Sequence, residues 1–268
     1  MPDHLLKKYR SMRDFGTTPE PAGGKPKKTR LPIFVIQKHA ATRLHYDFRL
    51  EMEGVLKSWA IPKGPSYDPS VKRLAMMTED HPYDYAAFEG VIPAGQYGGG
   101  NVIIWDNGTW ELTEPEDPVK GVKSGKLAFR MYGKKMFGEW ALVKIKGRPG
   151  SKGNEWLLLK HRDEFASEEV DVTELAPRSI VSELTVEEIG GVSHRTWQSN
   201  RAASSAHAPT LASRLEAEKK KKTTKKRSSA SPPTRSARAP KKAASARSRS
   251  SRAESPPKAQ PTRRRPPR

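Results

Sequence analysis

The sequence predicts a mainly β protein built as a compact antiparallel barrel. Short apolar segments with strand-like alternation follow one another from residue 32 to residue 161, turn signals separate them, and few windows show helical periodicity. We expect a barrel rather than an open sandwich, because a polar strand face that carries a site needs walls around it. The expected strands are Ile33–Lys38, His45–Met52, Lys57–Ile61, Arg73–Thr78, Asn101–Trp105, Thr109–Leu112, Lys126–Tyr132, Glu139–Ile145 and Glu155–His161.

Turn and capping signals divide these strands and predict short flanking helices. Asp106-Asn107-Gly108 predicts a tight hairpin, and Tyr132-Gly133-Lys134-Lys135 predicts a second turn. The glycine-rich stretch 92–100 matches no phosphate-binding fingerprint, so we expect a bulge-rich connection there. Residues 3–15 have helical spacing and are followed by prolines that end the helix. Thr185-Val186-Glu187-Glu188 has the spacing of a capping box and predicts another short helix.

Charge is distributed unevenly along the 268 residues. The formal net charge is +20, but residues 201–268 alone contain 21 Lys and Arg and 3 acidic residues, whereas residues 1–200 contain 29 basic and 27 acidic residues. The segment 201–268 has no aromatic residue, so it cannot bury enough apolar surface to offset the entropy of ordering it. We therefore expect an N-terminal helix and connector (1–31), a barrel (32–166), an acidic, partly helical extension (167–200) and a disordered basic tail (201–268).

Two absences limit the class of protein. Cysteine is missing, which excludes disulfides, a thiolate zinc site and a cysteine nucleophile. The N-terminus Met1-Pro2-Asp3-His4 lacks the apolar region of a signal peptide, and the longest uninterrupted apolar run has four residues. We therefore expect an intracellular protein that neither spans nor crosses a membrane.

The stretch from Gln37 to Glu51 carries the first candidate site. In an extended strand, His45, Asp47 and Arg49 lie on one face and the apolar residues between them lie on the other. Together with His39, His45 and Asp47 supply two imidazoles and a carboxylate, a set suited to Mn, Fe or Zn with open positions for a substrate. Arg49 beside such a metal is suited to holding an anion. The alternative is a surface pair of His45 with Asp47 and a turn capped by His39.

A second polar cluster follows the strand expected at 73–78. His81 could act as a general acid or contact a phosphate, and Tyr85 could donate to a phosphoryl oxygen, although the segment 79–85 also has the composition of an ordinary turn. Lys63 lies in a proline- and glycine-constrained loop, where it is either a cation that faces a substrate or a solvated turn residue.

These segments resemble a known family. Five ordered blocks, residues 37–51, 58–66, 79–85, 88–98 and 102–110, are similar to the 3'-phosphoesterase domain of bacterial DNA ligase D, and the resemblance extends from about residue 5 to residue 166. It implies a compact β-barrel with manganese-dependent activity, other divalent metals being alternatives, that removes a 3'-terminal ribonucleoside and then a 3'-phosphate from a primer strand. The chain differs from the family in its context, because it has no ligase or polymerase module and carries the basic tail.

The resemblance also implies roles for individual residues, including two in the N-terminal segment. The implied metal ligands are His39, His45 and Asp47. The implied contacts to the scissile phosphate are Arg49, His81 and Tyr85, and the implied supporting residues are Asp14, Glu20, Lys63, Arg73 and Glu79.

We therefore expect a stand-alone enzyme that processes DNA 3' ends for repair or end joining. Its expected substrates are primer–template 3' ends, including ribonucleotide-terminated ends, and the family's pathway implies a Ku-type end-binding protein and a separate DNA ligase as partners in the cytoplasm and nucleoid of a prokaryote. The basic tail should add salt-sensitive affinity for DNA or RNA without sequence preference. The alternatives are a non-catalytic nucleic-acid-binding scaffold with a degenerate barrel and a broader metal-dependent ribonuclease.

Overall fold

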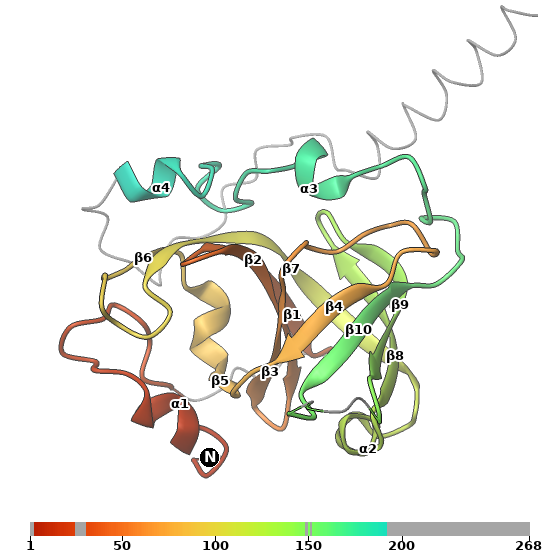
Figure 1. Ribbon diagram of the computed structural model, residues 1–268, viewed down its shortest axis with the longest axis horizontal. Coiled ribbons are helices and arrows are strands. Elements are labelled where there is room, and N and C mark those ends of the chain that lie inside the picture. The colour runs from red at the N-terminus through yellow and green to blue at the C-terminus, as the bar shows by residue number, and fades with distance from the viewer. Residues whose placement is uncertain (1–2, 25–30, 148–149, 151, 192–268) are drawn as a thin grey trace, which may run out of the picture. The chain divides into compact units, whose positions relative to one another are not determined.

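The computed structural model describes residues 3–24, 31–147, 150 and 152–191. Eight antiparallel strands form a closed ring in which β1 pairs with both β2 and β7. In spatial order these strands are β1 (Ile33–Ala40), β2 (Leu44–Met52), β3 (Val55–Ile61), β4 (Arg73–Met77), β10 (Glu155–Lys160), β9 (Phe137–Lys144), β8 (Lys126–Gly133) and β7 (Gly100–Glu114). The predicted antiparallel barrel is therefore confirmed (Figure 1).

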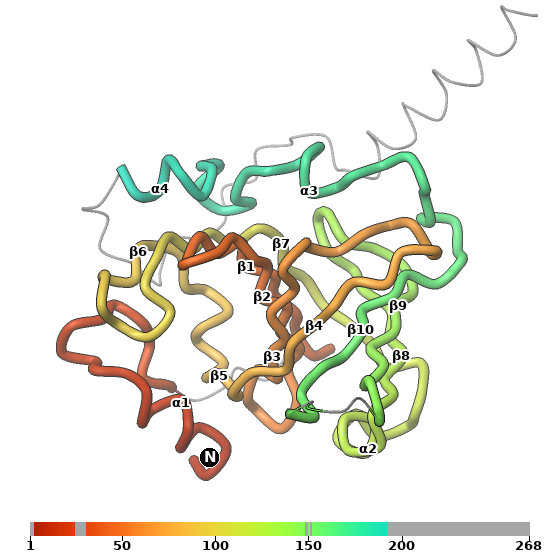
Figure 2. The backbone as a smooth tube through the Cα atoms, in the orientation of Figure 1, coloured from red at the N-terminus to blue at the C-terminus, as the bar shows by residue number. Residues whose placement is uncertain are grey.

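Short elements lie outside this ring. The strand β5 (His81–Pro82) pairs with β3, and β6 (Gly90–Ile92) pairs with β7. The helices are α1 (Lys7–Ser11), the 3-10 helix η1 (Tyr83–Ala87), α2 (Pro118–Ser124), α3 (Val172–Leu175) and α4 (Glu188–Gly191). Following the tube in Figure 2 shows that the N-terminal segment and the chain around η1 lie on the same side of the barrel.

The interior of the barrel is a large apolar core. All eight ring strands contribute to it, with side chains such as Phe48, Trp59, Phe129 and Trp156 almost completely buried. Strand alternation explains this arrangement, because residues of one parity point inward and those of the other parity point outward. On β2 the inward residues are Tyr46, Phe48 and Leu50, as the sequence predicts.

The opposite face of β1, β2 and β3 is also buried. A second apolar cluster lies there, which includes Tyr9 of α1, Tyr85 of η1, Val35 of β1 and Leu56 of β3, while the polar residues Asp47 and Arg49 of β2 are buried beside it. The polar face of β2 therefore lies outside the barrel interior, which corrects the expectation that barrel strands form the walls of the site. Its walls are the N-terminal segment, η1 and the connection between β6 and β7.

Two local predictions are wrong for identifiable reasons. Asp106-Asn107-Gly108 forms no hairpin, because β7 runs through it without a break. The Asp106 carboxylate is buried and accepts backbone hydrogen bonds from Lys134, Lys135 and Met136, so this side chain supports the predicted turn between β8 and β9. The N-terminal helix covers only Lys7–Ser11 of the expected 3–15. Neither α2 nor the short strands β5 and β6 were predicted.

The described part of the C-terminal extension packs on one end of the barrel. Val172 joins the apolar core, the Trp105 indole donates to the carbonyl of Ala176 at 2.7 Å, and Ile180 N–H donates to the carbonyl of Ile104 at 3.0 Å. The predicted capping box is present, since Thr185 N–H donates to the Glu188 carboxylate and Glu188 N–H donates to Thr185 Oγ1. The predicted disordered tail, 201–268, lies outside the described residues.

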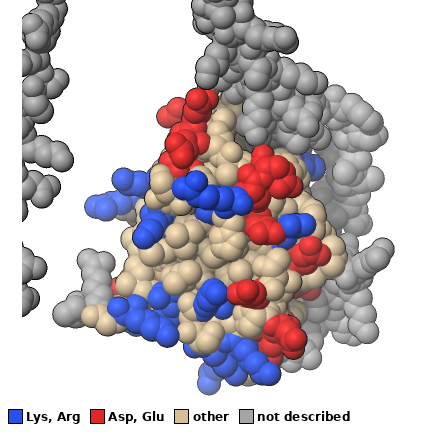
Figure 3. Space-filling view, turned by 90° about the vertical axis from the view of Figure 1, so that its right-hand side faces the viewer, with Lys and Arg blue, Asp and Glu red and all other residues tan. Residues whose placement is uncertain are grey.

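Basic and acidic side chains are interspersed on the face of the barrel drawn in Figure 3. This mixture agrees with the nearly balanced charge of residues 1–200.

Candidate functional site

Strand register brings the three predicted metal ligands together. His39 on β1 lies directly opposite His45 on β2, and Asp47 follows two residues later on the same face. The ring centres of His39 and His45 are 4.7 Å apart. One possible ligand atom from each of the three residues lies within 4.8 Å of the other two. His39 and Asp47 are buried, whereas His45 is half-buried, so the cluster is open to solvent on the His45 side.

Both histidines are oriented by backbone carbonyls. His39 Nε2–H donates to the carbonyl of Gly98 at 2.8 Å, and His45 Nδ1–H donates to the carbonyl of Arg43 at 2.8 Å. The other ring nitrogens, His39 Nδ1 and His45 Nε2, lie 3.4 and 3.6 Å from the Asp47 carboxylate. Metal-binding histidines commonly donate their second N–H to such outer partners. The residues present therefore fit a divalent cation with two imidazole ligands and one carboxylate ligand.

Asp47 remains ionised despite its burial. Burial raises the pKa of this carboxyl, but the Arg49 guanidinium and the two imidazoles outweigh it and hold the pKa well below its usual range. The side chain therefore presents a permanent negative charge to the two imidazoles.

The Arg49 guanidinium is fixed from three sides. It donates to Asp47 Oδ2 at 3.0 Å, to Gln37 Oε1 at 2.8 Å and to Ser58 Oγ at 2.9 Å, and the residue is 2% exposed. The Gln37 amide in turn donates to the carbonyls of Tyr85 and Phe88. Gln37 and Ser58 were not predicted as site residues. Their positions on the same faces of β1 and β3 as Asp47 and Arg49 on β2 are the signal that could have identified them.

His81 lies between two guanidinium groups. Its Nδ1 is 2.9 Å from an Arg49 nitrogen, and its Nε2 is 3.3 Å from an Arg13 nitrogen. Burial and these two positive charges lower the pKa of His81 well below its usual value, so the imidazole is neutral at physiological pH. A neutral imidazole can donate from one nitrogen and accept at the other.

Tyr85, Glu20 and Glu79 complete the buried network with Arg13. The Tyr85 hydroxyl donates to Glu20 Oε1 at 2.9 Å, and burial raises the pKa of Tyr85 well above its usual value, so the hydroxyl keeps its proton. Arg13 donates to Glu20 at 2.9 Å and lies 3.5 Å from Glu79. Its guanidinium stacks on the Tyr9 ring at 3.9 Å.

Arg13 was missed by the sequence reasoning. The available signal was its spacing four residues after the buried Tyr9, which puts both side chains on one side of the N-terminal turns. The structure thus joins Arg13 to a cluster that already contains six predicted residues, namely His39, His45, Asp47, Arg49, His81 and Tyr85, and the two predicted acidic residues Glu20 and Glu79.

Three other predicted residues lie apart from this network. Asp14 is exposed and accepts from the backbone N–H of Gly16 at 3.0 Å. Lys63 is exposed in the loop after β3. Arg73 is the first residue of β4, and its Nε has no hydrogen-bond partner among the described residues. The supporting roles of these three residues stay predictions.

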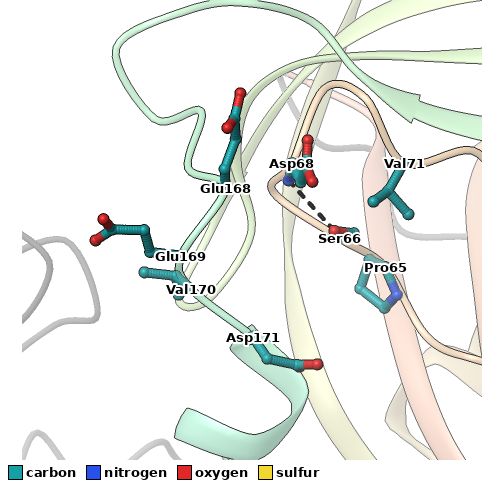
Figure 4. A pocket seen from close by; sticks show the side chains of 8 residues that line it. All are labelled: Pro65, Ser66, Asp68, Val71, Glu168, Glu169, Val170 and Asp171. Atoms are coloured by element: carbon teal, nitrogen blue, oxygen red, sulfur yellow. Dashed lines mark hydrogen bonds between the residues drawn. The ribbon is translucent and has the colours of Figure 1, made fainter.

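Two cavities in the described structure lie elsewhere. One of about 210 Å³ is lined by Pro65, Ser66, Asp68, Val71, Glu168, Glu169, Val170 and Asp171, shown in Figure 4. Another of about 420 Å³ is lined by Leu31, Pro32, Glu51, Met52, Glu53, Trp110, Glu111, Leu112, Glu116 and Pro118. Neither is lined by a residue of the histidine and arginine cluster.

Comparison with known proteins identifies the family of this domain. Residues 37–144 match the family model described as the DNA ligase D 3'-phosphoesterase domain. This range contains the candidate metal-ligand cluster of His39, His45 and Asp47 together with Arg49, His81 and Tyr85, so the resemblance expected from the sequence blocks is confirmed. The region 37–144 of this chain is therefore matched by the DNA ligase D 3'-phosphoesterase domain family.

Full-length relatives are much longer than the matched region. The multifunctional non-homologous end joining protein LigD of Pseudomonas aeruginosa is 50% identical over 185 residues, which cover 68% of this chain and 22% of that protein. The multifunctional non-homologous end joining DNA repair protein LigD of Mycobacterium tuberculosis is 42% identical over 173 residues, or 64% of this chain and 22% of that protein. The chain thus spans about a fifth of the length of the curated relatives it matches.

None of the helices in the described ranges is long and apolar enough to cross a membrane.

Proposed function

We propose that this protein is a metal-dependent phosphoesterase that processes DNA 3' ends, removing a 3'-terminal ribonucleoside and a 3'-phosphate to leave a 3'-hydroxyl. The observation that carries the proposal is the position of the His39, His45 and Asp47 cluster directly beside the fixed guanidinium of Arg49. The match to the phosphoesterase domain family and similarity to end-joining proteins support the substrate class.

His39 Nδ1, His45 Nε2 and the Asp47 carboxylate would hold the cation, for which we propose Mn²⁺. When bound, a divalent cation supplies charge that polarises a phosphoryl oxygen and lowers the pKa of a coordinated water. The protein's own contribution is positional: Arg49 and Arg13 neutralise charge on the phosphate from fixed directions, and they need no reorganisation when the charge develops.

His81 and Tyr85 supply proton-bearing groups to the same place. The low pKa of His81 is caused by burial and by the two guanidinium groups, so an anionic phosphate bound between them raises the imidazole's proton affinity. In that state His81 can protonate the leaving oxygen or hold the phosphate. The Tyr85 hydroxyl, kept protonated, serves as a hydrogen-bond donor.

We also propose that the basic residues of 201–268 hold nucleic acid close to the domain, since they contribute 21 of the 50 basic residues of the chain. A chain without 201–268 should bind duplex DNA more weakly, with a smaller dependence on salt. If deletion changes neither the affinity nor its salt dependence, the tail does not bind DNA. A Ku-type protein and a separate DNA ligase are the partners proposed from the relatives' end-joining function, in the cytoplasm of a prokaryote near its nucleoid DNA.

The test is hydrolysis of a primer–template whose primer ends in one ribonucleotide. With Mn²⁺, the purified full chain should shorten the primer and leave a 3'-hydroxyl, and His45→Ala should abolish both steps. His161→Ala is the matched control, because His161 is exposed on the barrel and lies outside the cluster. Unchanged 3' ends with wild-type protein would favour the non-catalytic scaffold, and equal cleavage of all-RNA strands would favour a broader ribonuclease.

A further inference from the structure

Tyr97 is an aromatic side chain left half in solvent beside the candidate site. It is 46% exposed, and in the described part of the chain only Tyr132, at 43%, is an aromatic residue of similar exposure. Tyr132 lies on β8 and donates a hydrogen bond to Glu111, and neither residue belongs to the candidate site. Tyr97 lies in the connection between β6 and β7, which forms one wall of the site. Single exposed aromatic rings are common on protein surfaces, so the position of Tyr97 beside the candidate site, rather than its exposure alone, is the relevant observation.

Three observations describe the surroundings of this ring. The Arg13 guanidinium carbon lies 5.3 Å from the centre of the Tyr97 ring. Burial, followed by the negative charge of Glu79, raises the pKa of Tyr97, which agrees with a hydroxyl beside that carboxylate. The next residue, Gly98, has φ of +74° and accepts the hydrogen bond that orients His39. The ring therefore lies beside Arg13, and the residue next to it contacts the candidate metal-ligand cluster.

This position determines what the ring can contact. A phosphate bound by Arg49, Arg13 and His81 is attached to a nucleoside, and these side chains are packed too closely to leave room for the nucleoside between them. It must extend toward the open side. An exposed aromatic ring at that edge offers a flat π-face, and nucleobases of any sequence stack on such faces.

We propose that Tyr97 is the platform on which the nucleobase of the 3'-terminal nucleotide stacks, and that it is a specificity-determining residue for nucleoside-bearing ends. The proposal rests on the proposed function, because it takes the phosphate of a DNA 3' end as the ligand. The alternative is that Tyr97 only positions Arg13. In that case its removal would weaken the binding of all phosphate ligands equally, whether or not they carry a base.

The test compares two DNA ends that differ in one base. The full chain is titrated, without added metal and at a salt concentration that suppresses non-specific binding, with primer–templates that end in a 3'-phosphate. One primer carries 2-aminopurine as its last base and the other carries an abasic residue there. Fluorescence anisotropy gives both affinities, and quenching of 2-aminopurine reports stacking directly. Because no hydrolysis is required, the result is independent of whether the protein is an active enzyme.

Wild-type protein should bind the end with the base about tenfold more tightly than the abasic end, a difference typical of one stacked base. Tyr97→Ala should reduce this ratio to near one and remove the quenching, whereas Tyr97→Phe and Tyr97→Trp, which keep an aromatic ring, should retain both. Tyr132→Ala is the matched control and should behave as wild type.

Three outcomes would overturn the proposal: a wild-type ratio near one, a ratio unchanged in Tyr97→Ala, or an equal loss of affinity for both ends in that variant. The last result would instead assign Tyr97 to holding Arg13. Failure of the proposed function would be seen separately, as an absence of hydrolysis by wild-type protein with Mn²⁺ on the ribonucleotide-terminated primer.

Discussion

The two faces of strand β2 show how one segment serves two different purposes. Phe48 points into the barrel and contacts the rings of Trp59 and Phe129, while the next residue, Arg49, points outward into a network of charged and polar side chains. The inner face is held by burial of apolar area, which depends on volume and shape. The outer face is held by specific partners for each polar group, so its arrangement depends on which atoms are present. Stability and activity should therefore respond to different residues on the same strand.

The largest expected effect is on the inner face. Phe48→Ala removes a fully buried ring and should lower the free energy of unfolding by about 3–5 kcal/mol. Urea denaturation measures this loss. The folded fraction should keep wild-type turnover, because no atom of the polar network changes. A lost turnover in fully folded Phe48→Ala protein would mean that the two faces are not separate.

On the outer face, Arg49→Ala should reduce the rate of phosphate hydrolysis by roughly 10²–10³-fold, the usual loss when one fixed donor to a developing charge is removed. Single-turnover kinetics with Mn²⁺ and a 3'-phosphate end measures it. Arg49→Lys keeps the charge but cannot contact Asp47, Gln37 and Ser58 at once, so it should recover only part of the rate. Full activity of Arg49→Lys would show that charge alone is needed.

Metal binding should stabilise the outer face specifically. At a Mn²⁺ concentration about 100 times the dissociation constant, the free energy of unfolding should rise by about 2.7 kcal/mol. His39→Ala removes one proposed ligand and should abolish this gain, whereas His161→Ala should keep it. Denaturation with and without Mn²⁺ tests both, and equal gains in the two variants would place the metal elsewhere.

The smallest effect concerns acid stability. His81 has a folded-state pKa well below the ordinary value of about 6.5, so the unfolded chain takes up a proton that the folded chain does not. Its contribution to stability is therefore present above about pH 6.5 and is lost as the pH falls below that value, by at most about 1.4 kcal/mol per pH unit. His81→Gln should remove this contribution, so the free energy of unfolding should fall less steeply between pH 7 and pH 5 in the variant than in the wild type. An unchanged slope would indicate a normally titrating His81.

Much of the fold was predictable because it depends on local alternation. The alternating pattern from His45 to Glu51 predicted which residues of β2 face inward and which face outward. In the structure, the register between β1 and β2 places His39 directly opposite His45. What escaped prediction depends on distant partners. Asp106-Asn107-Gly108 has the composition of a turn, but three backbone N–H groups from residues 134–136 bind Asp106 inside a continuous strand.

The same reasoning explains the incomplete prediction of the site. Arg13 joins the network because Glu20, Glu79 and His81, which lie in separate segments, converge on its guanidinium. No spacing rule connects these positions in the sequence. The resemblance to the family supplied Glu20 and Glu79, whereas Gln37 and Ser58 depend on strand register and on the hydrogen bonds they accept from Arg49.

A crystal structure of the chain with Mn²⁺ and phosphate, with the metal located by anomalous scattering, would test the central claim most directly. The account predicts one Mn²⁺ bound by His39 Nδ1, His45 Nε2 and the Asp47 carboxylate, with the phosphate in contact with Arg49 and His81. Manganese bound instead among the carboxylates of Asp68, Glu168 and Asp171, with the histidine cluster empty, would contradict it.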